Sequence, residues 1–260
     1  MTVFDITKQL EQIAPKETAE SWDHVGLTCG RYDNKVSKVM VLVDVTLDSI
    51  EYAIQNNVDL IIAHHPLMFN AVNEINDEEV IGEKLLKLIE NHISLYTMHT
   101  NFDANVMWKI VADKIGLTNV EVLDKISEET NIGIGAIGDF VANKPVSVKE
   151  LATLIKNNLS IDGIRVYGDA NREITKIAVL PGSGKGFWQM AKAKGANVFV
   201  SGDLGHHECL DAYEAGVDVI DATHFGLEKM FIDYIKEYIS EKYNEIEIDD
   251  YMQLSPYFSI

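Results

Sequence analysis

The chain has 260 residues, 47% of them hydrophobic, which is enough to bury one large core or two modest ones. Its 41 acidic and 22 basic residues give a net charge of -19, which argues against nucleic-acid and membrane-surface partners because both carry negative charge. No stretch reaches the roughly 20 apolar residues that span a bilayer, no signal-type leader is visible, and the two cysteines form no CxxC pair. We therefore expect a soluble, cytoplasmic protein.

The first half of the chain alternates between strand and helix patterns. The elements expected here are strand 38–44, helix 47–56, strand 59–63, helix 80–91, strand 93–98, helix 105–115 and strand-like segments near 121–123 and 135–140. The first three form a βαβ unit, so we expect a largely parallel sheet with right-handed crossovers.

The second half restarts the same alternation. Its expected elements are helix 148–155, strands 163–167 and 174–180, helix 186–194, strand 197–200, helix 206–215, strand 218–221 and helix 224–242. This restart predicts a second, smaller α/β domain.

Seven of the eight histidines lie in short polar clusters, most of which follow a predicted strand. His64 and His65 come directly after strand 59–63, at the carboxyl end of a parallel strand, where open α/β sheets place their binding sites. Because neighbouring side chains diverge there, the two imidazoles suit two ions a few ångströms apart better than one ion. This pair predicts a dinuclear metal centre.

Carboxylates from two other segments complete the predicted ligand set. Asp103 follows strand 93–98, and His224 and Glu228 are spaced i, i+4 at the start of the last helix, which places both on one face. Asp103 could instead be only a helix N-cap. Imidazoles and carboxylates together hold divalent ions and activate water. The candidate ligands are therefore His64, His65, Asp103, His224 and Glu228, a set that accepts iron, zinc, manganese or nickel.

Other polar residues are candidates for supporting roles. His99 is expected to orient ligands or carry protons, because Asp103 already occupies the ligand position of its segment. His206 and His207, at a predicted helix start, are candidate substrate binders or proton carriers, with surface histidines as the alternative. Asp44, at the end of strand 38–44, is either a positioning residue or a helix cap.

The glycine-rich stretch at residues 181–186 is similar to a phosphate-binding loop but departs from it twice. The first required glycine falls at Val179, and the Ser or Thr after the lysine is replaced by Gly186. A Walker-type NTPase is therefore excluded, although the loop amides could contact an anionic group weakly.

Five motifs together resemble the NIF-three-like family, whose members are called GTP cyclohydrolase 1 type 2 homologs. The motifs occupy residues 22–27, 63–69, 96–104, 201–207 and 221–228, in the order expected of the family. The chain departs from the family pattern at His24, where Asn is common, and at Thr223, where Gly commonly precedes the histidine.

The resemblance implies a two-domain α/β fold with a mostly parallel sheet and helices on both faces. A metal-binding domain of residues 1–124 and 216–260 would be interrupted by a smaller inserted α/β domain of residues 125–215. The resemblance also implies two divalent ions, iron or zinc being usual, a toroidal homohexamer, and opening of the purine ring of GTP. The family ligands carry over onto the same five residues.

The preferred function is that of a metal-dependent hydrolase with an unknown small-molecule substrate. Glu228, His99, His206 and His207 are the expected catalytic residues. The alternative is a non-enzymatic metal-binding scaffold or regulatory protein that stores or delivers ions.

Overall fold

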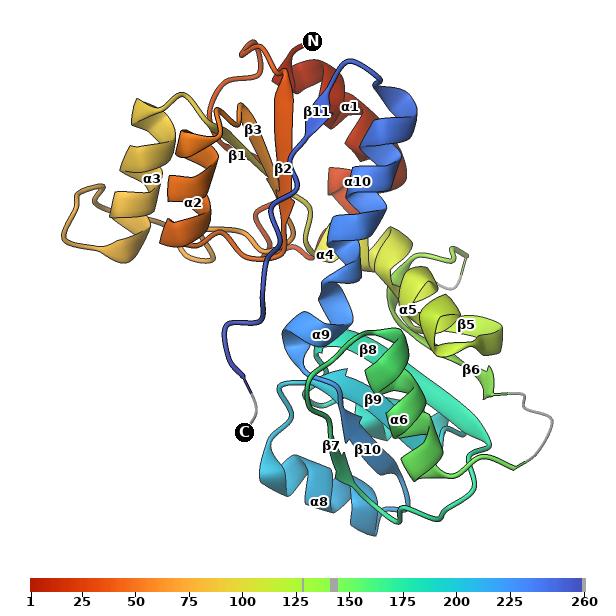
Figure 1. Ribbon diagram of the computed structural model, residues 1–260. Helices are drawn as coiled ribbons and strands as arrows, with labels where there is room; N and C mark the ends of the chain where they lie inside the picture. Colours follow the sequence, from red (N-terminus) through yellow and green to blue (C-terminus); the bar gives the residue numbers. More distant parts are fainter. Residues whose placement is uncertain (128, 141–144, 259–260) are drawn as a thin grey trace. The chain divides into compact units, whose positions relative to one another are not determined.

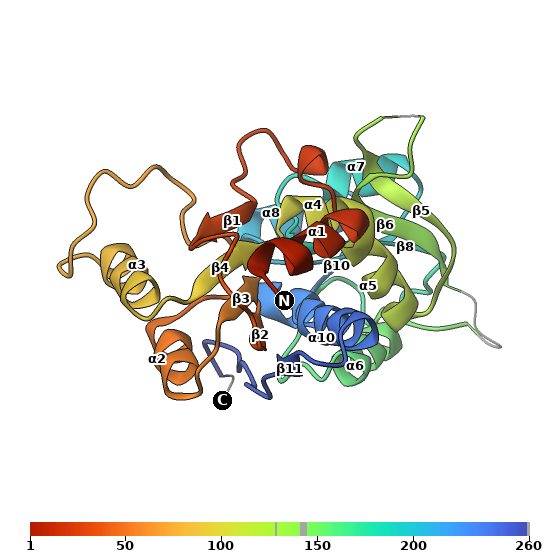
Figure 2. The same cartoon turned by 90° about the horizontal axis from the view of Figure 1, so that it is seen from above.

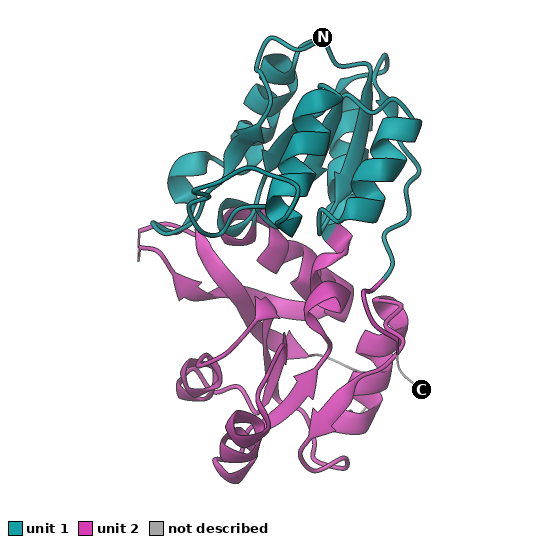
Figure 3. Ribbon diagram, turned by 90° about the vertical axis from the view of Figure 1, so that its left-hand side faces the viewer, with its two compact units in different colours: residues 1–102, 231–254 teal, residues 103–230, 255–260 magenta. Residues whose placement is uncertain are grey.

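The structure is a computed structural model that describes residues 1–127, 129–140 and 145–258. The chain forms two compact units (Figure 3). Unit 1 comprises Met1–Phe102 and Phe231–Leu254, and unit 2 comprises Asp103–Met230 and Ser255–Ile260. Both units contain a β-sheet and helices, so the predicted α/β class is confirmed.

Unit 1 is built on a five-stranded sheet. Its strands are, in spatial order, β1 (Gly26–Cys29), β4 (Ser94–Thr97), β3 (Leu60–Ala63), β2 (Lys38–Leu42) and β11 (Glu247–Ile248). Only the β1–β4 pair is antiparallel. The register aligns Leu42 with Ala63 and Ala63 with Thr97. Strands β2, β3 and β4 therefore end at one edge of the sheet, where their next residues lie side by side.

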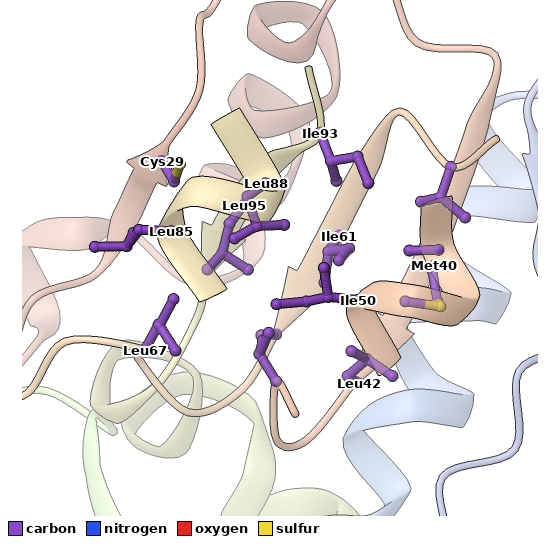
Figure 4. Packing of buried hydrophobic residues seen from close by; sticks show 14 residues of the cluster. Cys29, Met40, Leu42, Ile50, Ile61, Leu67, Leu85, Leu88, Ile93 and Leu95 are labelled. Carbon is purple, nitrogen blue, oxygen red and sulfur yellow. The ribbon is translucent and has the colours of Figure 1, made fainter. Parts of the chain in front are cut away.

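Helices cover both faces of this sheet (Figures 1 and 2). Helices α2 (Leu47–Gln55) and α3 (Val80–Glu90) cover one face, where Leu42, Ile61 and Leu95 from the strands pack with residues of both helices (Figure 4). Each large side chain buried in this way stabilises the fold by roughly 1.5–3 kcal/mol.

The opposite face carries α1 (Val3–Ile13) and α10 (Met230–Lys242), which are linked by a 3.1 Å hydrogen bond from Tyr238 Oη to the Gln9 carbonyl. Helix α1 is absent from the sequence prediction, although the capping box between Thr2 and Asp5 marks its start. Strand β1 was missed as well, and the short helices η1 (Lys16–Thr18) and α4 (Thr100–Phe102) complete unit 1.

Unit 2 has a six-stranded mixed sheet. Its strands are, in spatial order, β5 (Leu117–Lys125), β6 (Gly133–Phe140), β8 (Lys176–Ser183), β9 (Val198–Gly202), β10 (Asp218–Asp221) and β7 (Arg165–Tyr167). The central strands β8, β9 and β10 are parallel, whereas the β5–β6, β6–β8 and β7–β10 pairs are antiparallel. The expectation of a largely parallel sheet thus describes unit 1 and the centre of unit 2. Strands β5 and β6 follow each other with a short connection, which permits antiparallel pairing.

The helices of unit 2 follow the predicted order with two changes. They are α5 (Trp108–Ile115), α6 (Val148–Asn158), α7 (Trp188–Ala193), α8 (His206–Glu214) and α9 (His224–Glu228). Helices α7 and α8 pack with Phe199 of β9 in one core. A π-helix, Asp103–Met107, precedes α5, and the single helix expected at 224–242 is interrupted at Lys229. No helix within the described ranges combines the length and apolar character needed to cross a membrane.

The predicted domain boundaries differ from the limits of the two units. The two units are defined by contacts between residues. The predicted boundaries, between residues 124 and 125 and between residues 215 and 216, concern domains that fold independently, which contacts alone do not define. That division stays a prediction.

Both cysteines are free and buried, one in each core. Burial raises the pKa of both thiols, to about 11 for Cys209, where the Asp221 and Glu208 carboxylates add to the effect. Because the thiolate is the reactive form, we expect neither Cys29 nor Cys209 to react with Ellman's reagent at pH 8 in the native protein. Both should react within minutes in guanidinium chloride. Rapid labelling of the folded chain would contradict this burial.

Candidate metal centre

Three histidines gather where the strands of unit 1 end. His64 and His65 follow β3 directly, and His99 follows β4 by two residues. Each offers one ligand nitrogen, and these nitrogens all lie within 4.8 Å of one another. The ring centroids are 5.1 to 5.5 Å apart, and His64 is completely buried. The structure thus places His99 beside the two predicted ligands.

The Nδ1 atom of each of these histidines is bound to an oxygen of unit 1. The acceptors are the Met98 carbonyl for His64 (2.8 Å), Asp44 Oδ1 for His65 (2.7 Å) and Asp23 Oδ2 for His99 (3.0 Å). A carbonyl oxygen only accepts hydrogen bonds, so the Nδ1 atom of His64 carries the proton. With Nδ1 engaged in this way, Nε2 is the nitrogen of each ring that can bind an ion.

Asp23 fixes His99 more firmly than a surface carboxylate would. Its side chain is completely buried and accepts hydrogen bonds from the Thr100 amide (3.0 Å) and the Thr100 hydroxyl as well as from His99. Burial acts to raise the pKa of Asp23, but the hydrogen bonds from His99 and Thr100 outweigh it and hold this pKa at about 2. Asp23 is therefore an anion at neutral pH, and His99 donates to it through Nδ1.

Aromatic side chains surround the three histidines. The buried rings of Phe102 and Phe231 lie 6.2 and 5.1 Å from the His64 ring. The rings of Trp22 and Phe69 lie 6.0 and 5.8 Å from His99, and both are more than half exposed. Buried apolar rings thus border one part of the His64 ring, whereas His99 lies beside exposed aromatic surface.

In unit 2, His224 and Glu228 form a pair on one face of α9. Glu228 Oε2 lies 3.0 Å from His224 Nε2, one helical turn away, and the Glu228 carboxylate is almost completely buried. His224 Nδ1 lies 2.8 Å from Asp203 Oδ2. The side-chain pair expected from the i, i+4 spacing is therefore present, and its histidine repeats the Nδ1-to-oxygen pattern of unit 1.

Thr223 holds the start of α9 in an unusual backbone conformation. Its φ of 63° with ψ of 150° lies in a region that glycine adopts readily and β-branched residues avoid. The hydroxyl accepts a hydrogen bond from the Gly226 amide (3.1 Å), and the Thr223 amide donates to Asp221 Oδ1 (3.1 Å). Thr223 thus caps the helix beside His224 while it adopts a conformation that glycine favours.

Gly182 of β8 leaves space for the His224–Glu228 pair. A Cβ at this position would lie 2.6 Å from Glu228 Oε1 and 3.7 Å from His224 Nε2, and the residue has a φ of 74°. Sequence reasoning assigned residues 181–186 to a phosphate-loop lookalike and missed this role. The Pro-Gly dipeptide was the available signal, but it indicates a turn and not a neighbour 46 residues along the chain.

The remaining predicted residues are less closely grouped. Asp103 is the first residue of the π-helix, a kind of element that is frequent at functional sites, but it is not a member of the three-histidine group. His206 and His207 are exposed at the start of α8, where the His206 ring lies 6.1 Å from Tyr167. Their catalytic roles stay predictions.

We expect Gly182→Ala to bind divalent ions more weakly than the wild-type chain, because the added methyl group displaces the Glu228 carboxylate. Gly186→Ala is the matched control, since Gly186 also has a positive φ (86°) but an added Cβ there would meet no atom within 4 Å. Both variants should lose roughly 1–2 kcal/mol of stability from backbone strain. Calorimetric titration with Zn²⁺ and urea unfolding measure the two effects. Equal Zn²⁺ affinities of the two variants would contradict the proposed role of Gly182.

The Asp23 carboxyl should titrate near pH 2, well below its ordinary pKa of 3.8. Because the folded-state pKa is depressed, its ionised form stabilises the fold above about pH 4, and this contribution is lost as the pH falls through 2. Carbon-13 NMR of the Asp side chains measures the midpoint while the protein stays folded. His99→Ala should move it upward, and an ordinary midpoint in the wild-type chain would contradict the buried hydrogen bonds.

Comparison with known proteins places the chain in a family. Residues 1–253 match the profile described as Duf34/NIF3 (NGG1p interacting factor 3). A protein from Clostridium perfringens named GTP cyclohydrolase 1 type 2 homolog is 32% identical over 244 residues, which are 93% of this chain and 92% of the relative. A second protein of that name, from Clostridium acetobutylicum, is 33% identical and covers 88% of this chain and 85% of the relative.

Solved structures agree with this relationship. A hypothetical protein from Staphylococcus aureus superposes with a TM-score of 0.88 at 29% identity and covers 100% of this chain and 99% of that chain. Reduced HcgD from Methanocaldococcus jannaschii superposes with a TM-score of 0.83 at 32% identity and covers 95% of this chain and 96% of that chain. The chain therefore belongs to the Duf34/NIF3 family.

Proposed function

We propose that this chain holds two divalent metal ions and is a metal-dependent hydrolase that acts on a small molecule. The observation that carries the proposal is the Nδ1-to-oxygen hydrogen bond made by each of His64, His65, His99 and His224. Histidines that bind metals almost always donate their other ring N–H to a carboxylate or a carbonyl, which fixes the tautomer and the ring orientation. Four of the eight histidines in the chain make such a bond, and metal binding explains why they share it.

The donor atoms fit divalent ions in kind and in spacing. Two nitrogens that bind one ion lie at most about 4.2 Å apart, which is twice a metal–nitrogen distance. The nitrogens of His64, His65 and His99 that could bind an ion lie within 4.8 Å of one another, which is close to that limit. Only small side-chain shifts are needed to bind an ion, and adjacent histidines can serve different ions. The residues that would hold the pair are His64, His65, Asp103, His224 and Glu228.

Covalent connectivity supports ligands that come from both units. The chain passes between the units after Phe102 and after Met230, and the rings of Phe102 and Phe231 both lie beside His64. Consecutive Cα atoms are about 3.8 Å apart, so Asp103 is one such step from Phe102, and Glu228 is within about 11 Å of Phe231 along the chain. Both carboxylates are thus close in the sequence to residues that border the histidine group, and we propose them as ligands on that ground.

When bound, a pair of divalent cations supplies Lewis acidity, which makes water a nucleophile near neutral pH and polarises an electrophilic carbon or phosphorus. His99 would accept or return a proton at Nε2, because its Nδ1 atom is engaged by Asp23, which orients the ring. Glu228 would orient substrate or ligands through its buried carboxylate. His206 and His207 would bind substrate or carry protons.

The names of the relatives suggest GTP, but the charge of this chain favours other substrates. A net charge of -19 attracts cations and repels a nucleoside triphosphate. The exposed rings of Trp22 and Phe69 beside His99 offer apolar contact surface. We propose a substrate without a triphosphate, and a homohexamer in the reducing cytoplasm, where the two free cysteines are stable.

Metal binding is tested by anaerobic reconstitution with Fe²⁺, Zn²⁺, Mn²⁺ or Ni²⁺ and elemental analysis after gel filtration. We expect two ions per wild-type chain and one or none in His65→Ala and Glu228→Gln, because each removes a ligand. His92→Ala is the matched control, since His92 is exposed and lies outside the clusters. An ion content at background level in the wild-type chain, or no loss in the ligand variants, would refute the proposal.

Turnover distinguishes a hydrolase from a metal-binding scaffold, which the cation-attracting charge also suits. The loaded protein is screened against phosphoesters, nucleotides including GTP, and cyclic amides, with Glu228→Gln and His92→Ala in parallel. Hydrolysis that is lost in Glu228→Gln and kept in His92→Ala supports the enzyme. Stoichiometric ion binding without turnover of any compound supports the scaffold.

A further inference from the structure

Gln253, in the segment after β11, binds the backbone next to Asp44 with both ends of its side chain. Its Oε1 atom accepts hydrogen bonds from the amides of Val43 (2.7 Å) and Asp44 (3.2 Å). Its Nε2 atom donates to the carbonyl of Asp44 (2.8 Å). One amide side chain therefore satisfies three backbone groups, as a neighbouring strand would.

These contacts extend the sheet of unit 1 beyond the end of its edge strand. Strand β11 pairs with β2 only at Lys38 and Val39, and β2 ends at Leu42. On the opposite side of this segment, the Val43 carbonyl accepts a hydrogen bond from the His65 amide (2.9 Å). Val43 is thus held between His65 on one side and Gln253 on the other.

The segment held in this way carries the carboxylate that orients His65. Asp44 Oδ1 lies 2.7 Å from His65 Nδ1, and the Asp44 side chain is 41% exposed. Water competes for an exposed carboxylate, so its position depends on the backbone that carries it. Gln253 is the side chain that holds both the amide and the carbonyl of Asp44.

The segment that carries Gln253 is anchored to unit 1 and is not a free end. Tyr251 packs on Tyr52 with ring centroids 4.8 Å apart, and Asp249 pairs with Lys38 (3.1 Å). Met252 and Leu254 are 77% and 74% exposed, so successive side chains alternate between inward and outward directions. The inward positions hold Tyr251 and Gln253, and the outward positions serve as internal controls.

We propose that Gln253 is a positioning residue, which acts through Asp44 to fix the tautomer and orientation of His65 for metal binding. The metal-binding part of this inference rests on the proposed function, whereas the effect on the His65 ring does not. Gln253 lies 188 residues from His65 in the sequence and belongs to none of the five motifs.

The first test uses metal-free protein labelled with ¹⁵N-histidine. In the wild-type chain, long-range ¹H–¹⁵N spectra should show His65 as the Nδ1–H tautomer, and Gln253→Ala should shift its nitrogens toward a mixture of tautomers. His64 should not change, because its Nδ1 atom donates to the Met98 carbonyl. Met252→Ala should change neither ring. Unaltered His65 signals in Gln253→Ala would overturn the proposal, whether or not the chain binds metal.

The second test is a double-mutant cycle on Zn²⁺ affinity. We expect Gln253→Ala to weaken binding by about tenfold, the low end of the effect of removing a residue that orients a metal ligand. In an Asp44→Ala background, the same change should have no further effect, because Gln253 acts through Asp44. An equal loss in both backgrounds would show that the two residues act independently and would overturn the proposal.

A loss of folding in the Gln253 variant must be distinguished from a loss of His65 orientation. Gln253→Glu keeps the acceptor oxygen for the Val43 and Asp44 amides and guards against a Gln253→Ala chain that does not fold. Because this variant cannot donate to the Asp44 carbonyl, it should shift the His65 nitrogens in the same direction as Gln253→Ala, and wild-type His65 signals in the folded Gln253→Glu chain would overturn the proposal. A wild-type chain that binds no Zn²⁺ would refute the proposed function and leave the spectroscopic test intact.

Discussion

The proposed metal binding depends on one repeated interaction, the hydrogen bond from a histidine Nδ1 to an oxygen held by the fold. His64, His65 and His99 make it in unit 1, and His224 makes it in unit 2. An imidazole with this bond has its tautomer and its ring plane fixed before any ligand arrives. The oxygens belong to one backbone carbonyl and three carboxylates. The fold must hold each of these groups in place for the histidine rings to be oriented.

That support comes from the ends of parallel strands. Strands β2, β3 and β4 end in register, so that Asp44, the two adjacent histidines and Met98 follow at one edge of the sheet of unit 1. Helices α2 and α3 bury the leucine and isoleucine side chains that hold this edge. In unit 2, the strained Thr223 and the missing side chain at Gly182 set the place of His224 and Glu228. Backbone conformations that cost free energy are thus found beside the candidate ligands.

Local patterns in the sequence were sufficient for the parts of the site that lie within one element. The apolar run before His64 and His65 indicated a buried strand that ends at the histidines, and the i, i+4 spacing indicated a helix face with His224 and Glu228. The partners of these residues are distant in the chain, and periodicity carries no information about them. Asp23 meets His99 across 76 residues, and Gln253 meets Asp44 across 209. The antiparallel strand pairs in the sheet of unit 2 were missed for the same reason, because strand pairing joins residues that are distant in the sequence.

The central claim is that two ions are bound through the Nε2 atoms of histidines whose Nδ1 atoms are already engaged. Crystals of the reconstituted protein, with anomalous diffraction recorded at several metal edges, measure the identity, number and ligands of the ions in one experiment. We expect two peaks a few ångströms apart, bound by the Nε2 atoms of His64, His65 and His224 and by the carboxylates of Asp103 and Glu228. A single ion on other residues, or ions bound through Nδ1 with the hydrogen bonds to Asp44 and Asp203 broken, would contradict the account.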